Sequence, residues 1–153
     1  MEEKVRSFFE QNELAKKAAS SIKEGREIEL VLESNNSTET FVFSRKNKQN
    51  SIEKASAKSP DFIFHIPASS MDAICEQDFE SIPQAGIFIF KKMLSQDKSE
   101  KITFQVKAGL LSLVTGGYLG VLSSGGTEAM KFLASQGLGS IGKIKEKLTQ
   151  MRG

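Results

Sequence analysis

The first 23 residues carry apolar side chains at helical spacing, with charged and amide side chains between them. Apolar positions three and four residues apart lie on one face of an α-helix. The pattern therefore predicts an amphipathic helix over residues 3–23, ended by Gly25, because glycine is a common residue just beyond a helix. The apolar face of this helix would consist of Val5, Phe8, Phe9, Ala15, Ala18, Ala19 and Ile22.

From residue 27 the pattern changes to alternation, which is typical of strands with one buried face. In "REIELVLES", Ile28, Leu30 and Leu32 fall on the same face. "NNST" supplies turn residues and "ETFVFSR" resumes the alternation, so the sequence predicts a β-hairpin over 27–45. The polar, lysine-rich stretch "KNKQNSIEKASAKS" fits either a loop or a short exposed strand around Ile52, and the sequence does not decide between them.

The middle of the chain predicts a strand, two helices and a further strand. "PDFIFHIP" is apolar, and prolines suit the ends of strands rather than their middles. "ASSMDAICEQ" predicts a short helix capped by Ser69 or Ser70, and Pro83 suits the first turn of a second helix. Within that second segment, "GIFIF" has strand propensity while the apolar residues keep helical spacing. "EKITFQVKAG" alternates throughout, which predicts a strand over 101–108.

Residues 108–127, "AGLLSLVTGGYLGVLSSGGT", contain no charged side chain and have the length of a membrane span. Six glycines and five Ser or Thr residues interrupt the apolar residues, and glycine costs about 1 kcal/mol relative to alanine in a helix. The predicted strand also runs directly into the segment. These features favour core, or a glycine-jointed wall of an apolar cavity, over a membrane span. Two further helices are predicted in the remaining 26 residues, around the "GLG" that joins them.

The composition is that of an ordinary soluble globular protein, with 39% hydrophobic and 26% charged residues. Its length predicts one domain over 1–153, with a core of about 1–126 and a C-terminal helical extension of about 127–153. A net charge of +2 argues against a nucleic-acid partner. Cys75 is the only cysteine and the N-terminus has no apolar signal region, so we expect a cytoplasmic location. Eleven Phe, one Tyr and no Trp suit a core or an apolar cavity.

No motif predicts catalysis or a bound metal or cofactor. "GLGSIGKI" at 137–144 matches glycine-rich phosphate motifs, but it follows a predicted helix, and Ile144 stands where magnesium binding needs Ser or Thr. His65, the only histidine, lies in an apolar strand and is interpreted as a hydrogen-bonded structural residue. Cys75 has no evident basic neighbour to lower its pKa, so we interpret it as a small apolar residue. We expect the protein not to be an enzyme.

Three stretches resemble the sterol carrier protein type 2 family. "SPDFIFHIPASSMDAICE" resembles its Asp-led strand running into a short helix, and "IPQAGIFIF" resembles its Pro-Gln followed by a small and aromatic run. "EKITFQVKAG" resembles its next alternating strand, which ends in glycine. The likeness covers about residues 20–125. The chain departs from the family in the long link "IFKKMLSQDKSE" and in the extension after Gly126, both of which would reshape or plug a tunnel mouth.

The resemblance implies an α+β fold, with a twisted and mostly antiparallel sheet of about five strands covered by helices around an apolar tunnel. It also implies non-enzymatic binding or transfer of lipids, such as fatty acids, acyl chains or sterol-like molecules, driven by apolar burial. Transient contact with a membrane surface is compatible with the basic C-terminal helix. The residues expected to line the tunnel are Phe88, Met93, Leu113, Tyr118, Leu122 and Met130.

Two other functional classes remain open at the level of sequence. One is a protein–protein interaction or accessory module whose apolar C-terminal half packs against a partner. The other is an accessory domain of an enzyme, in which His65 or Asp61 would act as a catalytic group. The sequence identifies neither the ligand nor the oligomeric state.

Overall fold

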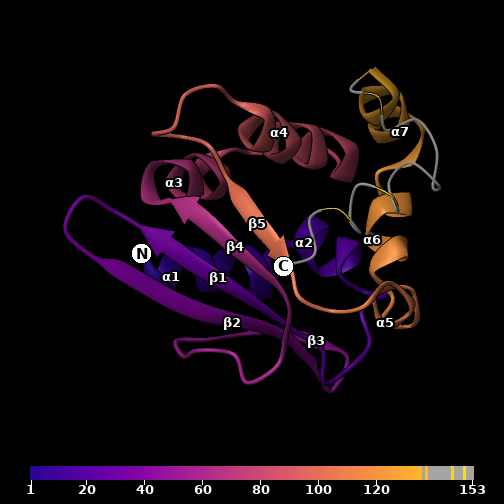
Figure 1. Ribbon diagram of the computed structural model, residues 1–153, viewed down its shortest axis with the longest axis horizontal. Coiled ribbons are helices and arrows are strands. Elements are labelled where there is room, and N and C mark those ends of the chain that lie inside the picture. Colours follow the sequence, from indigo (N-terminus) through magenta and orange to yellow (C-terminus); the bar gives the residue numbers. More distant parts are fainter. Residues whose placement is uncertain (136, 138–145, 147–149, 151–153) are drawn as a thin grey trace.

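The protein folds into an α+β structure in which one five-stranded sheet is covered by short helices (Figure 1). The computed structural model describes residues 1–135, 137, 146 and 150, without the side chains of residues 129, 130 and 133. The strands are β1 (Glu27–Glu33), β2 (Thr38–Lys46), β3 (Gln49–Glu53), β4 (Pro60–Pro67) and β5 (Thr103–Val106). This arrangement confirms the predicted fold class.

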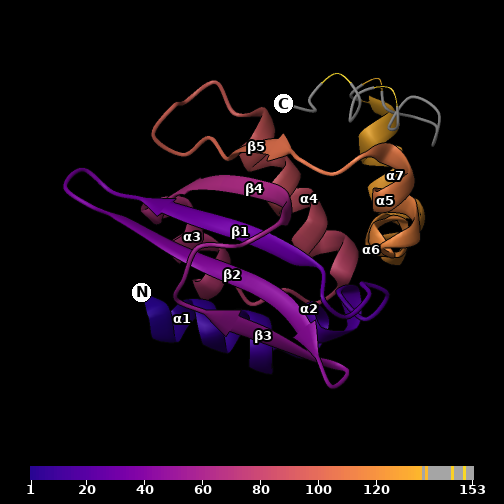
Figure 2. The same cartoon turned by 60° about the horizontal axis from the view of Figure 1, so that its bottom comes forward.

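The sheet has the strand order β3-β2-β1-β4-β5 (Figure 2). β1, β2 and β3 form an antiparallel meander, β4 lies parallel to β1, and β5 is antiparallel to β4. Paired residues lie on the same face of a sheet. Leu30 is opposite Phe41 on β2 and Phe64 on β4, so apolar side chains line up across the strands and form a continuous apolar face. Of the four strand pairs, only β1–β4 is parallel, so the sheet is mostly antiparallel.

The prediction of one continuous N-terminal helix over 3–23 is wrong, because the chain forms three shorter helical elements there. The chain forms α1 (Glu2–Arg6), a single π-helical turn η1 (Ser7–Gln11) and α2 (Glu13–Ala18). The break occurs at Asn12, whose backbone is extended with φ −71° and ψ 124°. Its side-chain Oδ1 accepts hydrogen bonds from the backbone N–H of Leu14 (2.9 Å) and Ala15 (3.2 Å). Asn12 is thus an N-cap, a role that favours asparagine strongly and starts a new helix.

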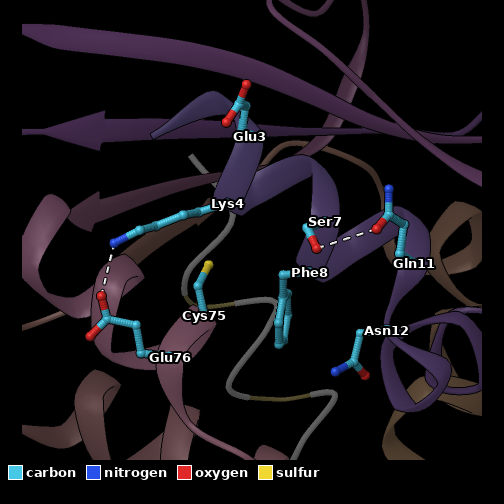
Figure 3. A pocket seen from close by; sticks show the side chains of 8 residues that line it. All are labelled: Glu3, Lys4, Ser7, Phe8, Gln11, Asn12, Cys75 and Glu76. Carbon is cyan, nitrogen blue, oxygen red and sulfur yellow. Dashed lines mark hydrogen bonds and ion pairs between the residues drawn. The ribbon is translucent and has the colours of Figure 1, made fainter.

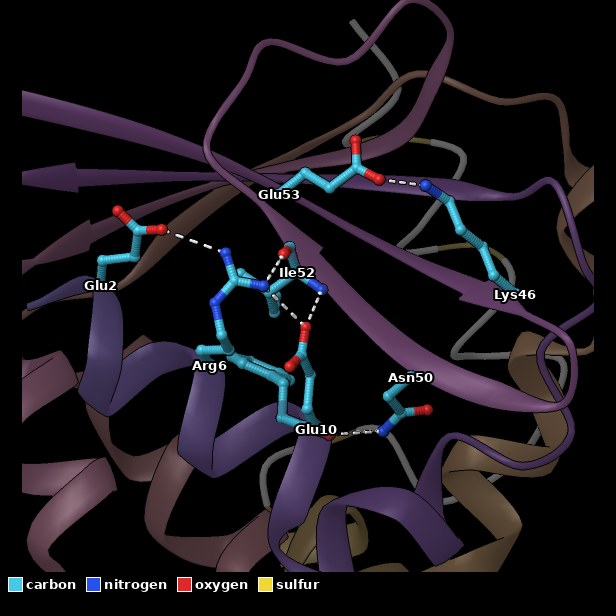
Figure 4. A network of polar contacts seen from close by, with 8 residues as sticks. Glu2, Arg6, Glu10, Lys46, Asn50, Ile52 and Glu53 are labelled. Carbon is cyan, nitrogen blue, oxygen red and sulfur yellow. Dashed lines mark hydrogen bonds and ion pairs between the residues drawn. The ribbon is translucent and has the colours of Figure 1, made fainter.

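The stretch around Ile52 is an edge strand, and its side chain is fully buried rather than exposed. The first helices supply the partners that an edge strand lacks (Figure 4). Arg6 Nη1 donates to the carbonyl oxygen of Ile52 (2.7 Å), and the N–H of Ile52 donates to Glu10 Oε1 (2.8 Å). Asn50 Nδ2 donates to the carbonyl oxygen of Phe9 (2.7 Å). These contacts place α1 and η1 along β3.

Two helices follow β4, as predicted: α3 (Ala68–Glu76) and α4 (Ile82–Leu94). The expected capping of α3 by Ser69 or Ser70 is wrong, because both hydroxyls donate instead to carbonyl oxygens of the loop before β5. Ser69 bonds Ser99 (3.2 Å) and Ser70 bonds Glu100 (2.6 Å). The ambiguous "GIFIF" is helical, in α4, whose cap is Ser81.

The uncharged segment 108–127 forms short helices rather than a strand extension: α5 (Leu110–Thr115), α6 (Tyr118–Ser124) and the start of α7 (Gly126–Ser135). β5 is accordingly shorter than the predicted 101–108. Within the described part of the chain, no helix is long and apolar enough to cross a membrane. Of the motif at 137–144 only Gly137 is described, and of the predicted last helix only Glu146 and Gln150, so both predictions lie outside the described residues.

α6 packs unusually close to the chain that follows α2. A Cβ at Gly117, which has φ +89°, would lie 1.8 Å from the carbonyl oxygen of Ser21, and one at Gly120 would lie 2.3 Å from Ser21 Oγ. Ser21 Oγ also donates to the carbonyl oxygen of Gly117 (2.8 Å). The glycines therefore allow two backbones to meet, and this contact fixes α6 at the end of the sheet beside α2.

Candidate ligand-binding cavity

An apolar cavity of about 370 Å³ lies between the apolar face of the sheet and the helices that cover it. A volume of this size is at the lower end of the range for small-molecule sites. It exceeds the engineered 150 Å³ cavity in another protein that stays dry and binds benzene. The residues that line it are Phe8, Phe9, Asn12, Leu14, Ala15, Ala18, Ala19, Ile22, Ile28, Leu30, Phe43, Phe64, Ile66, Met71, Ile74, Phe79, Ile82, Ala85, Gly86, Ile89, Phe90, Met93, Ile102, Val121, Leu122 and Gly125.

The cavity wall is almost entirely hydrocarbon. Among the described residues of the lining, Asn12 supplies the only side chain that can make conventional hydrogen bonds. The sheet contributes large side chains, including Phe43 and Phe64. The Phe64 ring stacks on Phe104 at a centroid distance of 5.3 Å, which holds it in place. Such a wall can bind an aliphatic or ring-shaped hydrocarbon but offers little to a sugar, nucleotide or peptide.

The cavity exists because small residues on the helices face large residues on the sheet. Ile82, Gly86, Ile89 and Met93 recur at helical spacing along the inner side of α4, and all four line the cavity. A Cβ at Gly86 would meet no atom within 4 Å, so this position leaves space where a side chain would otherwise fill the core. No residue of α4 is fully buried, although the helix is rich in Ile and Phe. α4 therefore covers a hollow instead of packing tightly.

Side contacts hold α4 in place over the cavity. Phe88 lies edge-on to Phe79 at 5.4 Å, and Phe90 stacks on Phe132 of α7 at 6.3 Å. Lys92 Nζ donates to Glu100 Oε2 (2.9 Å). These contacts attach α4 at its flanks and end, and they leave its inner side free to face a ligand.

The structure places two of the six predicted lining residues, Met93 and Leu122, at the cavity. Phe88 lies outside the lining and packs against Phe79. Leu113 and Tyr118 are buried in the core, which they help to fill. Met130 belongs to α7, and its side chain lies outside the described residues.

Tyr118 is held by a buried polar network. Its hydroxyl donates to Asp61 Oδ2 (2.6 Å), and Arg26 Nη1 approaches Asp61 Oδ1 (3.3 Å) and donates to Ser112 Oγ (2.7 Å). The Asp61 carbonyl oxygen also accepts from the N–H of Lys107 (2.9 Å). Asp61 is 6% exposed, so its charge is compensated by these partners. The network joins β4, α5 and α6.

The Tyr118 phenol is expected to resist ionisation until the protein unfolds. Burial, and then the hydrogen bond to Asp61, raise the pKa of Tyr118 well above its ordinary 10.0. Above pH 10 the unfolded chain ionises this phenol and the folded protein does not, so stability falls as the pH rises through this range and is unaffected below it. Because Tyr118 is the only tyrosine, an alkaline absorbance titration reads it directly. Ionisation of the folded protein near pH 10, as in the urea-denatured chain, would contradict the network.

His65 lies on the sheet face opposite the cavity, since its neighbours Phe64 and Ile66 both line the cavity. Its Nδ1 lies 2.8 Å from Glu33 Oε1, and the side chain is partly exposed. The described residues contain no group of three or more His, Cys, Asp or Glu side chains able to hold a metal. The hydrogen bond predicted for His65 is therefore present.

A second, open pocket of about 450 Å³ lies between the first helices and α3 (Figure 3). Lys4 Nζ bonds Asp72 Oδ1 (2.9 Å) and Glu76 Oε1 (2.8 Å) beside it. Burial, with Asp72 nearby, raises the pKa of the Cys75 thiol in this pocket to about 11, so the thiol is not activated. Phe8 and Asn12 line both this pocket and the apolar cavity, so the two spaces adjoin at these side chains.

Sequence reasoning missed most of the cavity. The missed residues come from the strands of the sheet as well as from the helices that cover it. Their signal is the pairing of small helix residues (Ala15, Ala18, Ala85, Gly86) with large sheet residues. A comparison with family models, curated proteins and solved structures finds no match for this chain.

Proposed function

We propose that the protein binds or transfers lipids, holding the hydrocarbon part of a fatty acid, acyl chain or sterol-like molecule in the cavity, without catalysis. The observation that carries this proposal is a cavity of about 370 Å³ with one polar side chain, Asn12, among the 26 described residues that line it. The proposed fold relationship to sterol carrier proteins agrees with it, because that resemblance implies a helix-covered sheet around an apolar space. A cytoplasmic location is part of the same proposal.

Apolar burial would supply the affinity. Each methylene moved from water into such a wall contributes about 0.8 kcal/mol. A chain of roughly ten methylenes then contributes about 8 kcal/mol before the cost of association, which is of similar order. Affinity in the micromolar range or tighter therefore requires a long chain or a fused ring system, and short-chain metabolites would not bind.

An interaction module is the second candidate, and the surface of α5 favours it. Leu111 is 77% exposed, and Leu110 and Val114 beside it are 38% and 37% exposed. Isolated apolar side chains on a surface are ordinary, but three on one short helix form a small patch. A partner protein would cover this patch, and a membrane surface would cover it during transient contact while lipid is loaded.

The proposed function is tested with the purified full chain. Organic extraction followed by mass spectrometry is expected to release lipid, and the uncharged dye Nile red is expected to bind saturably with a rise in fluorescence. The interaction module would be favoured instead by a protein that releases no lipid on extraction and does not bind Nile red. Such a protein would form a tight homodimer or retain a protein partner.

A further inference from the structure

Asn12 is positioned to contact the polar end of a bound lipid. Its Oδ1 is occupied by the backbone N–H groups of Leu14 and Ala15, which fixes the orientation of the amide. The amide nitrogen is therefore a donor of known direction, and no described residue accepts a hydrogen bond from it. In Figure 3 the amide nitrogen lies on the Phe8 side of the residue. It is thus a fixed donor where the apolar cavity meets the open pocket.

The open pocket beyond Asn12 carries more negative than positive charge. Glu3 and Glu76 line it together with one cation, Lys4. Lys4 already bonds both Asp72 and Glu76, at 2.9 and 2.8 Å. An anionic headgroup would therefore meet two acidic side chains and an ammonium group whose charge is already matched. An uncharged headgroup avoids this repulsion.

The other polar side chains of the pocket suit an uncharged group. Ser7 and Gln11 line it, and the hydrogen bond from Ser7 Oγ to Gln11 Oε1 is long at 3.5 Å. Both side chains are partners that a ligand hydroxyl or carbonyl can use in place of water. Phe8 stands between this polar region and the hydrocarbon wall (Figure 3).

We infer that the ligand is a lipid with an uncharged, oxygen-bearing headgroup, a hydroxyl, ester or amide, which accepts a hydrogen bond from Asn12 Nδ2 while its hydrocarbon occupies the cavity. This inference rests on the proposed function and narrows it, because it ranks neutral lipids above fatty-acid anions. The Asn12 donor supplies the contact, and the acidic pocket supplies the discrimination.

The test compares two probes with the same chain, 1-tetradecanol and tetradecanoate, as competitors of Nile red on the full-length protein near neutral pH. We expect tetradecanol to bind at least about fivefold more tightly, the equivalent of one net hydrogen bond. Equal affinities, or tighter binding of tetradecanoate, would overturn the headgroup inference and leave lipid binding intact. If neither probe displaces Nile red, the proposed function fails as well.

Two variants separate the donor from the charge. Asn12→Asp keeps a side-chain oxygen for the cap of α2 and removes the donor, so tetradecanol affinity is expected to fall about fivefold. Unchanged tetradecanol affinity in a folded Asn12→Asp protein would overturn the role of Asn12. The double variant Glu3→Gln/Glu76→Gln leaves Asn12 in place, and the ratio of tetradecanoate to tetradecanol affinity is expected to rise about threefold or more. A ratio that does not move would overturn the role of the acidic pocket.

Discussion

Replacing Gly117 by alanine is expected to destabilise the protein by about 3 kcal/mol or more. A side chain at φ +89° costs roughly 1–2 kcal/mol, because an L-residue is strained in the left-handed region. The new Cβ would also lie 1.8 Å from the carbonyl oxygen of Ser21, and backbone atoms cannot rotate away from it. Overpacking of this kind costs a further 1–3 kcal/mol or so. Thermal unfolding followed by circular dichroism should show a Tm lower by about 6–12 °C.

Two controls separate strain from close approach. Gly126 has φ +63°, but a Cβ there would meet no atom within 4 Å. Gly126→Ala therefore adds backbone strain without a clash, and should lower the free energy of unfolding by about 1–2 kcal/mol. In Gly120→Ala the new Cβ would clash with the Ser21 side chain, at 2.3 Å from Oγ. Adding Ser21→Gly removes that side chain and should restore the lost stability. The same second substitution should not restore the stability of Gly117→Ala, whose clash is with the Ser21 backbone. Equal costs for Gly117→Ala and Gly126→Ala would show that α6 does not dock against Ser21 as described.

Gly86→Leu is expected to block the cavity without unfolding the protein. The position lies on the inner side of α4 among lining residues, and a Cβ there meets open space. Leucine also removes the helix cost of glycine, which is about 0.8–1 kcal/mol in a helix interior. We expect Nile red affinity to fall more than about tenfold, with a Tm equal to that of the parent protein or higher. Fluorescence titration and thermal unfolding of the same sample measure both quantities.

Gly86→Ala is the matched control for that substitution. One methyl group changes the cavity volume little, so the affinity should stay within about threefold of the parent while stability rises by about 0.5–1 kcal/mol. Undiminished Nile red binding by Gly86→Leu would mean that the dye binds elsewhere, for example at the exposed leucines of α5.

Alternation of apolar and polar residues predicted β1, β2 and β5, and an apolar run bracketed by prolines predicted β4. The strand at Ile52 could not be decided, since it is an edge strand whose outer backbone groups bond Arg6 of α1 and Glu10 of η1, which lie far away in the sequence. The N-terminal periodicity likewise did not reveal the break at Asn12, because apolar residues continue at helical spacing on both sides of it. Local pattern predicts which face is apolar, whereas tertiary partners decide where elements start and stop.

The sequence predicted an apolar cavity but identified few of the residues that line it. Met93 lies on an apolar stripe of α4 and Leu122 on a short apolar helix, so periodicity alone could propose both. Periodicity cannot distinguish a residue that lines a void from one that fills the core. Tyr118 illustrates the difference, since its bond to Asp61 places it in the core. The missed signal was Gly86, a small residue on the inner stripe of a helix otherwise rich in Ile and Phe.

Native mass spectrometry of the freshly purified full chain, beside Gly86→Leu, tests lipid binding in this cavity most directly. It reads the bound mass and the number of subunits in one spectrum. The account predicts one lipid-sized adduct per chain on the parent protein, removed by organic extraction and missing from folded Gly86→Leu. A parent protein that carries no adduct and takes none up from added 1-tetradecanol would contradict the account, as would an adduct that Gly86→Leu retains in full.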